Sequence, residues 1–392
     1  MHTYHEETEA TTMLSEREAR IRSEARAVIE KHIKPNAAKL DREGIYPWDN
    51  LKELAKHGYC GIIIPKEYGG LGLGLRDLCI VEEEIGRGCG TTSQVLIGHY
   101  LCMVSILWHG NEEQKHRYLP PLARGEKLGT FAITEPASGS NVAEMTTTAA
   151  EGANGFVLNG RKHFIGNAGT ATVFITFAAT DPEKGARGIS SFIVEKGSPG
   201  FSNDRKEDMM GLRGADVGDV VFNDCLLPVA QLLGARNRGF HQAMQTLDVT
   251  RPMVGAQAIG VAQAAFEESM AFSKKRVTFG KPIFDHQSIK FSLADMFVNI
   301  LAGRLLILNA ASIHDSQGKG RFSKEASAAK LFSTEAATRV VGQAVQIHGG
   351  YGYTKDCPVE RMYRDVRVFE LYEGTSEIQR LVIARRLEEE MA

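Results

Sequence analysis

The stretch Leu371-Tyr-Glu-Gly-Thr-Ser-Glu-Ile-Gln379 places a carboxylate at the entrance to the last predicted helix. Ser376 and Gln379 have the S-x-x-Q spacing of a capping box, in which both side chains bond free N–H groups at a helix start. Glu373 then lies on a short loop beside the aromatic Tyr372, a setting that suits a general base against an apolar pocket. Taken alone, the stretch also fits a solvated acid favoured by the helix dipole.

Length, composition and charge are those of an ordinary globular protein. A chain of 392 residues exceeds what one core usually supports, so two or three domains are expected. The net charge of -2 argues against a nucleic-acid partner, which needs a basic face. The six cysteines lack C-x-x-C spacing and the twelve histidines lack H-E-x-x-H spacing, so neither disulfides nor a metal site are predicted.

No targeting or membrane segment is predicted. The first thirty residues are charged throughout and lack the apolar stretch of a secretory signal. Apolar runs such as Tyr100 to Trp108 are too short to span a bilayer. We therefore expect a cytoplasmic protein without membrane insertion.

The chain divides into three regions by the spacing of its apolar residues. Residues 1–128 are predicted to be mainly helical, and the first helical pattern stops near Pro35. Residues 129–238 carry short alternating strands without intervening helices, which indicates a small β-sandwich or barrel. The helical pattern is Ile21, Ala25, Val28, Ile29 and Ile33, and the strands are 156–160 with a hairpin-type Asn159-Gly160, 173–177, 189–194 and 220–222.

Helices return in residues 239–392. Thr250 before Arg251-Pro252 is the predicted N-cap of one helix, with proline in its first turn. Another helix runs from Ala326 to Ile347 and ends at Gly349-Gly350. Between them, one apolar helix face is formed by Leu293, Met296, Phe297, Ile300, Leu301, Leu305 and Leu308.

From about residue 14 to 388 the chain resembles the acyl-CoA dehydrogenase family of flavoproteins. The resemblance implies an α+β fold with a helical N-terminal domain, a β middle domain and a C-terminal four-helix bundle. It rests on six blocks in the family's order: Ala132-Ile-Thr-Glu-Pro136 with Gly139-Ser140, Phe164-Ile-Gly-Asn167, Asp248-Val-Thr-Arg-Pro252, Arg276-Val-Thr-Phe-Gly280, Gln346-Ile-His-Gly-Gly350 and Tyr372-Glu-Gly-Thr375.

The reaction implied by the resemblance is the oxidation of an acyl-CoA thioester to a 2-enoyl-CoA. It needs a base for the α-proton, donors for the enolate oxygen and an electron sink, which in this family is FAD. Glu373 matches the family's base in its commonest placement. A minority of members place the base at the position of Thr250, which cannot act as one. Burial should raise the pKa of Glu373 toward neutrality.

The resemblance also assigns FAD-binding residues. Residues beside the isoalloxazine ring are Phe131, Ile133, Thr134, Phe164, Ile165 and Gly166. Residues that reach the adenine and diphosphate of FAD across two subunits are Arg276, Thr278, Phe279, Gln287, Gln346 and Gly350. Thr375 and Glu377 lie at the cap of the last helix, where N–H groups favour anions. Because two subunits share each FAD in the family, a homotetramer, built as a dimer of dimers, is expected.

Substrate contacts are assigned in the same way. Ser140 resembles the residue that touches the CoA arm, and Gln94 and His99 are polar candidates for the acyl pocket, with Val95, Gly98 and Met103 beside them. Further contacts are expected from Leu247, Asp248, Thr250, Arg251, Tyr372 and Gly374. A core histidine or a helix-surface residue is the alternative for Gln94 and His99. The acyl group therefore stays open among straight, cyclic, branched and functionalised forms.

Two positions depart from the family's pattern. Gly166 stands where many relatives have a threonine whose hydroxyl reaches flavin N5, and Asn141 stands where aspartate is common. The first departure bears on the flavin's potential and on its electron acceptor, which is expected to be an electron-transfer flavoprotein.

Other activities occur on the same fold. An acyl-CoA oxidase or an enoyl-CoA reductase working in reverse would keep Glu373. Lyase-type relatives lack the base, and decarboxylating members carry an arginine near residue 92, where this chain has Thr91-Thr92-Ser93. A non-catalytic assembly subunit is disfavoured by the intact Glu373, Arg251 and flavin blocks.

Overall fold

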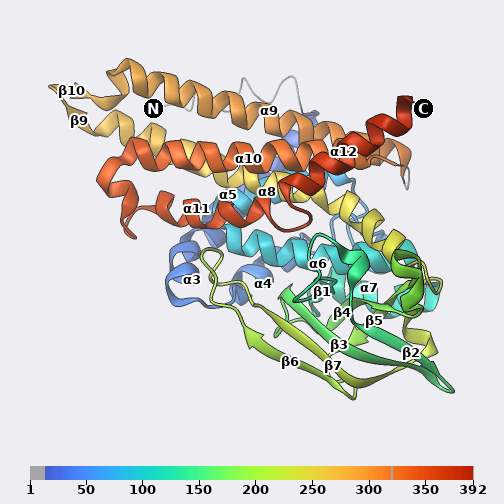
Figure 1. Cartoon of the computed structure of the whole chain (residues 1–392). Coiled ribbons are helices and arrows are strands. Elements are labelled where there is room, and N and C mark those ends of the chain that lie inside the picture. The colour runs from blue at the N-terminus through green and yellow to red at the C-terminus, as the bar shows by residue number, and fades with distance from the viewer. Residues whose placement is uncertain (1–13, 319–320, 392) are drawn as a thin grey trace.

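The computed structural model describes residues 14–318 and 321–391 (Figure 1). Within them the chain forms a helical N-terminal part, a central sheet and a helical C-terminal part, which confirms the predicted three-part α+β fold. Residues 1–13, which were included in the first predicted region and in the argument against a secretory signal, lie outside the described residues.

The N-terminal part is helical, and α6 is buried along most of its length between the sheet and the C-terminal helices. The first helical stretch ends at Ile33, near Pro35 as predicted, and a separate α-helix begins at Ala37. The chain passes through a π-turn and a 3-10 turn, and proline is tolerated in the first turn of the latter because the N–H there has no helical partner. The elements are α2 (Glu16–Val28), η1 (Ile29–Ile33), η2 (Lys34–Asn36), α3 (Ala37–Glu43), α4 (Trp48–Lys56), η3 (Lys66–Tyr68), α5 (Leu75–Gly88), α6 (Gly90–His109) and α7 (Glu112–Ala123).

The middle part is one eight-stranded sheet with the order β6-β7-β3-β2-β4-β5-β8, and β1 pairs in parallel with β4. Side chains alternate between two cores. Phe174 and Phe192 enter a core enclosed by the sheet, whereas Ile175 and Phe177 pack into the core of the helices. The strands are β1 (Gly129–Ala132), β2 (Thr148–Gly152), β3 (Gly155–Gly166), β4 (Val173–Ala179), β5 (Ile189–Glu195), β6 (Phe201–Lys206), β7 (Val217–Pro228) and β8 (Leu232–Leu233), with short turns η4 (Val142–Glu144), η5 (Pro182–Gly188) and η6 (Val229–Gln231).

The Asn159-Gly160 pair is not the predicted hairpin turn. It lies inside β3, where the register with β7 shifts between Leu158 and Gly160, as in a β-bulge. The Asn159 side chain holds this bulge, because its amide donates to Asp224 at 3.0 Å and accepts from the Asp224 N–H at 2.8 Å. The hairpin between β2 and β3 turns at residues 153–154 instead.

In the C-terminal part α8, α9 and α10 lie side by side, with α11 and α12 against α10 (Figure 1). The end of α10 at Gly349, with φ 57°, confirms the predicted glycine-dependent stop. The elements are α8 (Gly239–Lys275), β9 (Val277–Thr278), β10 (Lys281–Pro282), η7 (Ile283–Asp285), α9 (Gln287–Gln317), α10 (Ser323–His348), η8 (Gly349–Tyr353), α11 (Pro358–Val366), η9 (Arg367–Glu370) and α12 (Ser376–Met391).

The predicted helix start at Thr250 is wrong. α8 begins at Gly239 and runs through Pro252 without a break. A proline inside a helix removes one hydrogen bond, but this stretch of α8 is buried against α5, α6 and α10. Burial on several sides thus outweighs the local signal, since most helical stability in proteins comes from packing.

The predicted apolar face of α9 is only partly covered. Leu293, Met296 and Ile300 are buried, whereas Phe297 and Leu305 are 38% and 47% exposed, because α8 and α10 cover only part of its width. By length and composition α9 is long and apolar enough to cross a membrane, contrary to the expectation that every apolar run is too short. Here it packs against α8, α10 and α5.

A buried ion pair fixes the wall between β1 and β3. Lys162 Nζ lies 2.7 Å from Glu135 Oε1, and both side chains are buried. We predict that Lys162→Met lowers the free energy of unfolding by about 3 kcal/mol, because an unpaired buried carboxylate remains. Denaturant titration measures the loss, and the control Glu135→Gln/Lys162→Met should recover most of it. A Lys162→Met protein as stable as wild type would contradict this role.

Candidate active site

A cavity of about 280 Å³ lies where the three parts of the chain meet. Its walls come from α6, β1 with its following loop, the end of β3, the first third of α8 and the loop before α12. The structure brings together there most of the residues predicted around the flavin ring and the substrate: Gln94, Gly98, Phe131, Ile133, Thr134, Ser140, Phe164, Ile165, Gly166, Leu247, Arg251, Tyr372, Glu373 and Gly374. Asn141 lies there as well.

Glu373 sits on the loop between η9 and α12 in a left-handed conformation, with φ 53°. Such a conformation is uncommon for a residue other than glycine and persists only where its surroundings impose it. Three bonds supply that constraint. Gln379 Nε2 donates to the carbonyls of Glu373 and Gly374 at 3.1 and 2.8 Å, and Lys330 Nζ donates to the Gly374 carbonyl at 2.9 Å.

The predicted capping box of α12 is displaced by one residue. Thr375 is the cap, because its hydroxyl accepts from the Ile378 N–H at 3.3 Å. The Ser376 hydroxyl is buried without a hydrogen bond among the described residues. The Gln379 side chain bonds carbonyls of the Glu373 loop instead of a free N–H. The motif therefore fixes the loop more than it caps the helix.

The Glu373 carboxylate is only half satisfied. Its Oε2 accepts from the Thr250 hydroxyl at 2.6 Å, and its Oε1 is buried with no hydrogen-bond partner in residues 14–318 and 321–391. Burial raises the pKa of Glu373 to about 7, against the opposing influence of Thr250, Arg251 and Lys330. The alternative of a solvated surface acid is therefore wrong. A carboxyl group with this pKa is poised to take up a proton near neutral pH.

Arg251 lines the cavity, and its guanidinium group is held in place by Asp248. Its Nη1 lies 2.6 Å from Asp248 Oδ1, and Asp248 in turn accepts from the Ser323 hydroxyl. Neither Asp248 nor Thr250 lines the cavity. Both were predicted to contact the substrate. Instead, Asp248 pairs with Arg251, and Thr250 donates a hydrogen bond to Glu373.

The wall opposite is built from β1 and β3. Phe164 is 56% exposed with φ 56°, although an apolar ring is more stable when it is covered. The Thr130 hydroxyl donates to the Gly166 carbonyl at 2.5 Å, which fixes the backbone next to it. A side chain at Gly166 would meet only Gln94 Nε2, at 3.9 Å, and Gln94 Oε1 is buried without a partner among the described residues.

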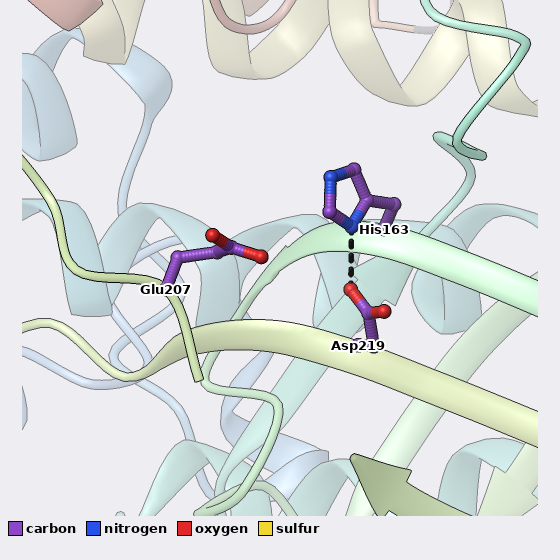
Figure 2. A group of neighbouring side chains, drawn as sticks. All are labelled: His163, Glu207 and Asp219. Carbon is purple, nitrogen blue, oxygen red and sulfur yellow. Dashed lines mark hydrogen bonds and ion pairs between the residues drawn. The ribbon is translucent and has the colours of Figure 1, made fainter. Parts of the chain in front are cut away.

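A charged cluster is formed by His163, Glu207 and Asp219, with Glu207 beside the His163–Asp219 hydrogen bond (Figure 2). His163 Nδ1 is 2.5 Å from Asp219 Oδ1, and the His163 ring packs on Phe164 with centroids 3.8 Å apart. By residue type the cluster could bind a metal ion. However, Asp219 also pairs with Arg161 and Glu207 with Arg205, so its charges are already compensated. We interpret it as a support for the Phe164 ring.

A second pocket, of about 500 Å³, lies at the far end of α8. It is lined by Arg276, Thr278 and Gly350, as predicted, whereas Gln346, Phe279 and Gln287 are outside its lining. Arg276 packs on the Tyr351 ring and forms no ion pair with a described residue. At Gly350 a Cβ atom would meet nothing within 4 Å. A free guanidinium beside bare glycine backbone suits a phosphate group.

Three further predicted residues lie elsewhere. His99 is fully buried, with Nε2 3.0 Å from the Leu122 carbonyl and Nδ1 accepting from the Gly129 N–H, so it is a core histidine and not a pocket residue. Thr375 and Glu377 begin α12 but line neither pocket. Of the remaining acyl-pocket candidates, Val95 and Met103 are core residues.

Several lining residues were not predicted. Phe240 and Met244 precede Leu247 and Arg251 on one face of α8, with spacings of four, three and four. The sequence carries this periodicity, but a helix predicted to start at Thr250 leaves Phe240, Met244 and Leu247 outside it. Ile97, Leu101 and Ile378 complete the apolar wall.

Comparison with known proteins gives matches along the whole described chain. The family models described as acyl-CoA dehydrogenase N-terminal, middle and C-terminal domain match residues 15–126, 130–225 and 237–388. The chain is 45% identical to acryloyl-CoA reductase (NADH) of Anaerotignum propionicum, over 93% of this chain and 92% of the relative.

Two solved structures are similar throughout. Butyryl-CoA dehydrogenase from Megasphaera elsdenii has a TM-score of 0.93 and 38% identity, covering 96% of this chain and 99% of the other. A chain in the structure of the electron transferring flavoprotein of Acidaminococcus fermentans has a TM-score of 0.93 and 38% identity, covering 95% and 98%.

The open space beside Gly166 in the cavity allows a larger side chain at this position. Gly166→Thr adds a hydroxyl beside the flavin ring that the resemblance places here, and one hydrogen bond is worth on the order of 1 kcal/mol. We expect a changed flavin midpoint potential or reoxidation rate and no change in which acyl-CoA is accepted. Redox titration and stopped-flow reoxidation measure the two. Values identical to wild type in both would show that position 166 is neutral.

Proposed function

The chain belongs to the acyl-CoA dehydrogenase family, and on that premise we propose that it oxidises an acyl-CoA thioester to the 2-enoyl-CoA with Glu373 as the base. It is an FAD-dependent oxidoreductase, as the members of this family are. The observation that supports this reaction best is the Glu373 carboxylate, whose pKa burial raises to about 7 and whose Oε1 has no partner among the described residues.

The residues present fit FAD. Phe164 offers an exposed ring face in the cavity, and the Gln94 oxygen, which has no partner among the described residues, requires a polar partner there. The cavity wall formed by Phe131 to Thr134 and by Phe164 to Gly166 would hold the isoalloxazine ring of the flavin. Arg276 and Gly350 would hold the diphosphate. When bound, FAD supplies the acceptor for the hydride that leaves the β-carbon.

Proton transfer and substrate binding fall to Glu373 and to residues that support it or line the cavity. Glu373 Oε1 takes the proton from the α-carbon while Oε2 stays bonded to Thr250, which keeps the carboxylate oriented. The Glu373 N–H donates to no described residue, so it is free to stabilise the enolate oxygen of the thioester. Ser140 and Arg251 line the cavity and are available to the CoA portion.

We propose a short acyl group as the substrate. The cavity is small, and its apolar wall is formed by bulky side chains, namely Ile97, Leu101, Phe240 and Met244. The similarity to butyryl-CoA dehydrogenase supports the same class. The partner that receives the electrons is proposed to be an electron-transfer flavoprotein, in line with the similarity to a chain in such a structure.

A second candidate function is the reverse reaction, reduction of a short enoyl-CoA. It is favoured by the 45% identity to an acryloyl-CoA reductase. Anaerobic mixing distinguishes the two directions. Oxidised protein with butyryl-CoA and an electron-transfer flavoprotein tests dehydrogenation, and enoyl-CoA with NADH and the same flavoprotein tests reduction.

We also propose a homo-oligomer, built as a tetramer in the cytoplasm without membrane insertion. The cavity contacts Arg251 on α8 and the second pocket contacts Phe272, so the two are separated by about 30 Å along a helix that rises ~1.5 Å per residue. One FAD molecule does not span that separation. The second pocket therefore serves the cofactor of another copy, and the exposed Phe279 and Phe297 suit the interface.

The assignment of the base is tested by Glu373→Gln. We predict that this variant retains FAD and binds acyl-CoA but loses roughly 10²–10⁴-fold in the rate of flavin reduction, the usual effect of removing a general base. Stopped-flow absorbance measures the rate. Glu388→Gln, an exposed acid on α12, is the matched control and should be unaffected. Retention of most activity in Glu373→Gln would falsify the assignment.

The shared cofactor site is tested by Arg276→Ala. We predict a lower FAD occupancy per subunit, because a charge-assisted contact to the diphosphate is lost. The absorbance ratio of purified protein measures occupancy, and Lys281→Ala, outside the pocket on the same hairpin, is the control. Gel filtration should give a dimer or tetramer. A flavin-loaded monomer, or full occupancy in Arg276→Ala, would contradict the proposal.

A further inference from the structure

Lys330 lies in the middle of α10, directly beneath the Glu373 loop. The residue is fully buried, and its ammonium group makes one hydrogen bond, to the carbonyl of Gly374 at 2.9 Å. No carboxylate lies within ion-pair distance of it in the part of the chain that the structure describes. A buried ammonium without a close counter-ion is costly, so its position calls for a functional explanation.

Several charged groups face Lys330. Glu373 is the acid that acts on it most strongly, Arg251 adds a second positive charge, and Glu370 and Glu335 act more weakly. Burial lowers the pKa of Lys330 to about 8, although these acids favour its protonated form. The Glu373 carboxylate is in turn influenced by Arg251 and Lys330, and accepts its one hydrogen bond among the described residues from Thr250.

We propose that Lys330 is a positioning residue for the base: it holds the Gly374 carbonyl, and its positive charge favours the ionised form of the Glu373 carboxylate. This inference rests on the proposed function of Glu373. Proton abstraction needs the anionic form, whereas burial in an apolar cavity favours the neutral one. A cation behind the loop counters that effect without entering the cavity, because Lys330 does not line it.

The charge at position 330 determines the direction in which the pH profile of kcat/KM moves. The profile of kcat/KM reports the pKa values of the free enzyme, and activity falls on the acid side as the base is protonated. Removing the positive charge at 330 raises the pKa of Glu373. The acid limb of the profile then moves to higher pH, and activity lost at pH 7 returns as the pH is raised.

Three variants separate the hydrogen bond from the charge. Lys330→Gln keeps a donor for the Gly374 carbonyl and removes the charge, Lys330→Met removes both, and Lys330→Arg keeps the charge. With butyryl-CoA and an artificial electron acceptor, we expect the acid limb to move up by about one pH unit in Lys330→Gln and Lys330→Met, with about fivefold lower kcat/KM at pH 7. Lys330→Arg should keep the wild-type limb.

The result that overturns the proposal is an acid limb at the wild-type position in Lys330→Gln with normal FAD content. An equal shift in Lys330→Arg would also overturn it, because loss of packing would then explain the effect. If Lys330→Met does not retain FAD, Lys330→Gln carries the same expectation. The Glu373→Gln variant tests the base itself, so an active Glu373→Gln protein would refute the proposed function, whereas an unmoved limb alone refutes only the role of Lys330.

Discussion

The site depends on one constraint, a carboxylate held in a strained loop conformation against a buried cavity. Glu373 has φ 53°, and a chain without compensating bonds does not keep a glutamate in that conformation. The bonds come from three different helices: α8 supplies Thr250, α10 supplies Lys330 and α12 supplies Gln379. The Glu373 carboxylate is therefore positioned by contacts from three helices of the C-terminal bundle.

The cavity beside the Glu373 carboxylate is formed by all three parts of the chain. No single part encloses the cavity, because α6, the ends of β1 and β3, and α8 each provide one wall. α6 contacts both the sheet and α8, and its near-complete burial makes it the common support of all three parts. The ion pair between Glu135 and Lys162 keeps the sheet side of the cavity in register. Most of the lining residues lie on helices and strands, which suits a reaction that needs fixed geometry.

Sequence patterns predicted the three-part architecture and the family resemblance pointed to Glu373, whereas local signals failed where packing overrode them. The change from helical to alternating periodicity marked the sheet, which begins at Gly129. Thr250-Arg-Pro reads as a helix start only as long as burial on several sides is unknown, and Asn159-Gly160 reads as a turn until β7 pairs across it. His99 is polar, but two backbone partners in the core satisfy its ring. Lys330 had no sequence signal, since a lysine in an alanine-rich helix usually faces solvent.

The most direct test is the structure of the FAD-loaded protein with a non-reactive butyryl-CoA analogue. The central claim is that Glu373 Oε1 faces the α-carbon of an acyl-CoA in this cavity. We predict a separation of about 3–3.5 Å between these atoms, as expected for a near-attack geometry, with the thioester oxygen within hydrogen-bond distance of the Glu373 N–H. An acyl group bound elsewhere, or a Glu373 side chain turned away from the α-carbon, would contradict the claim.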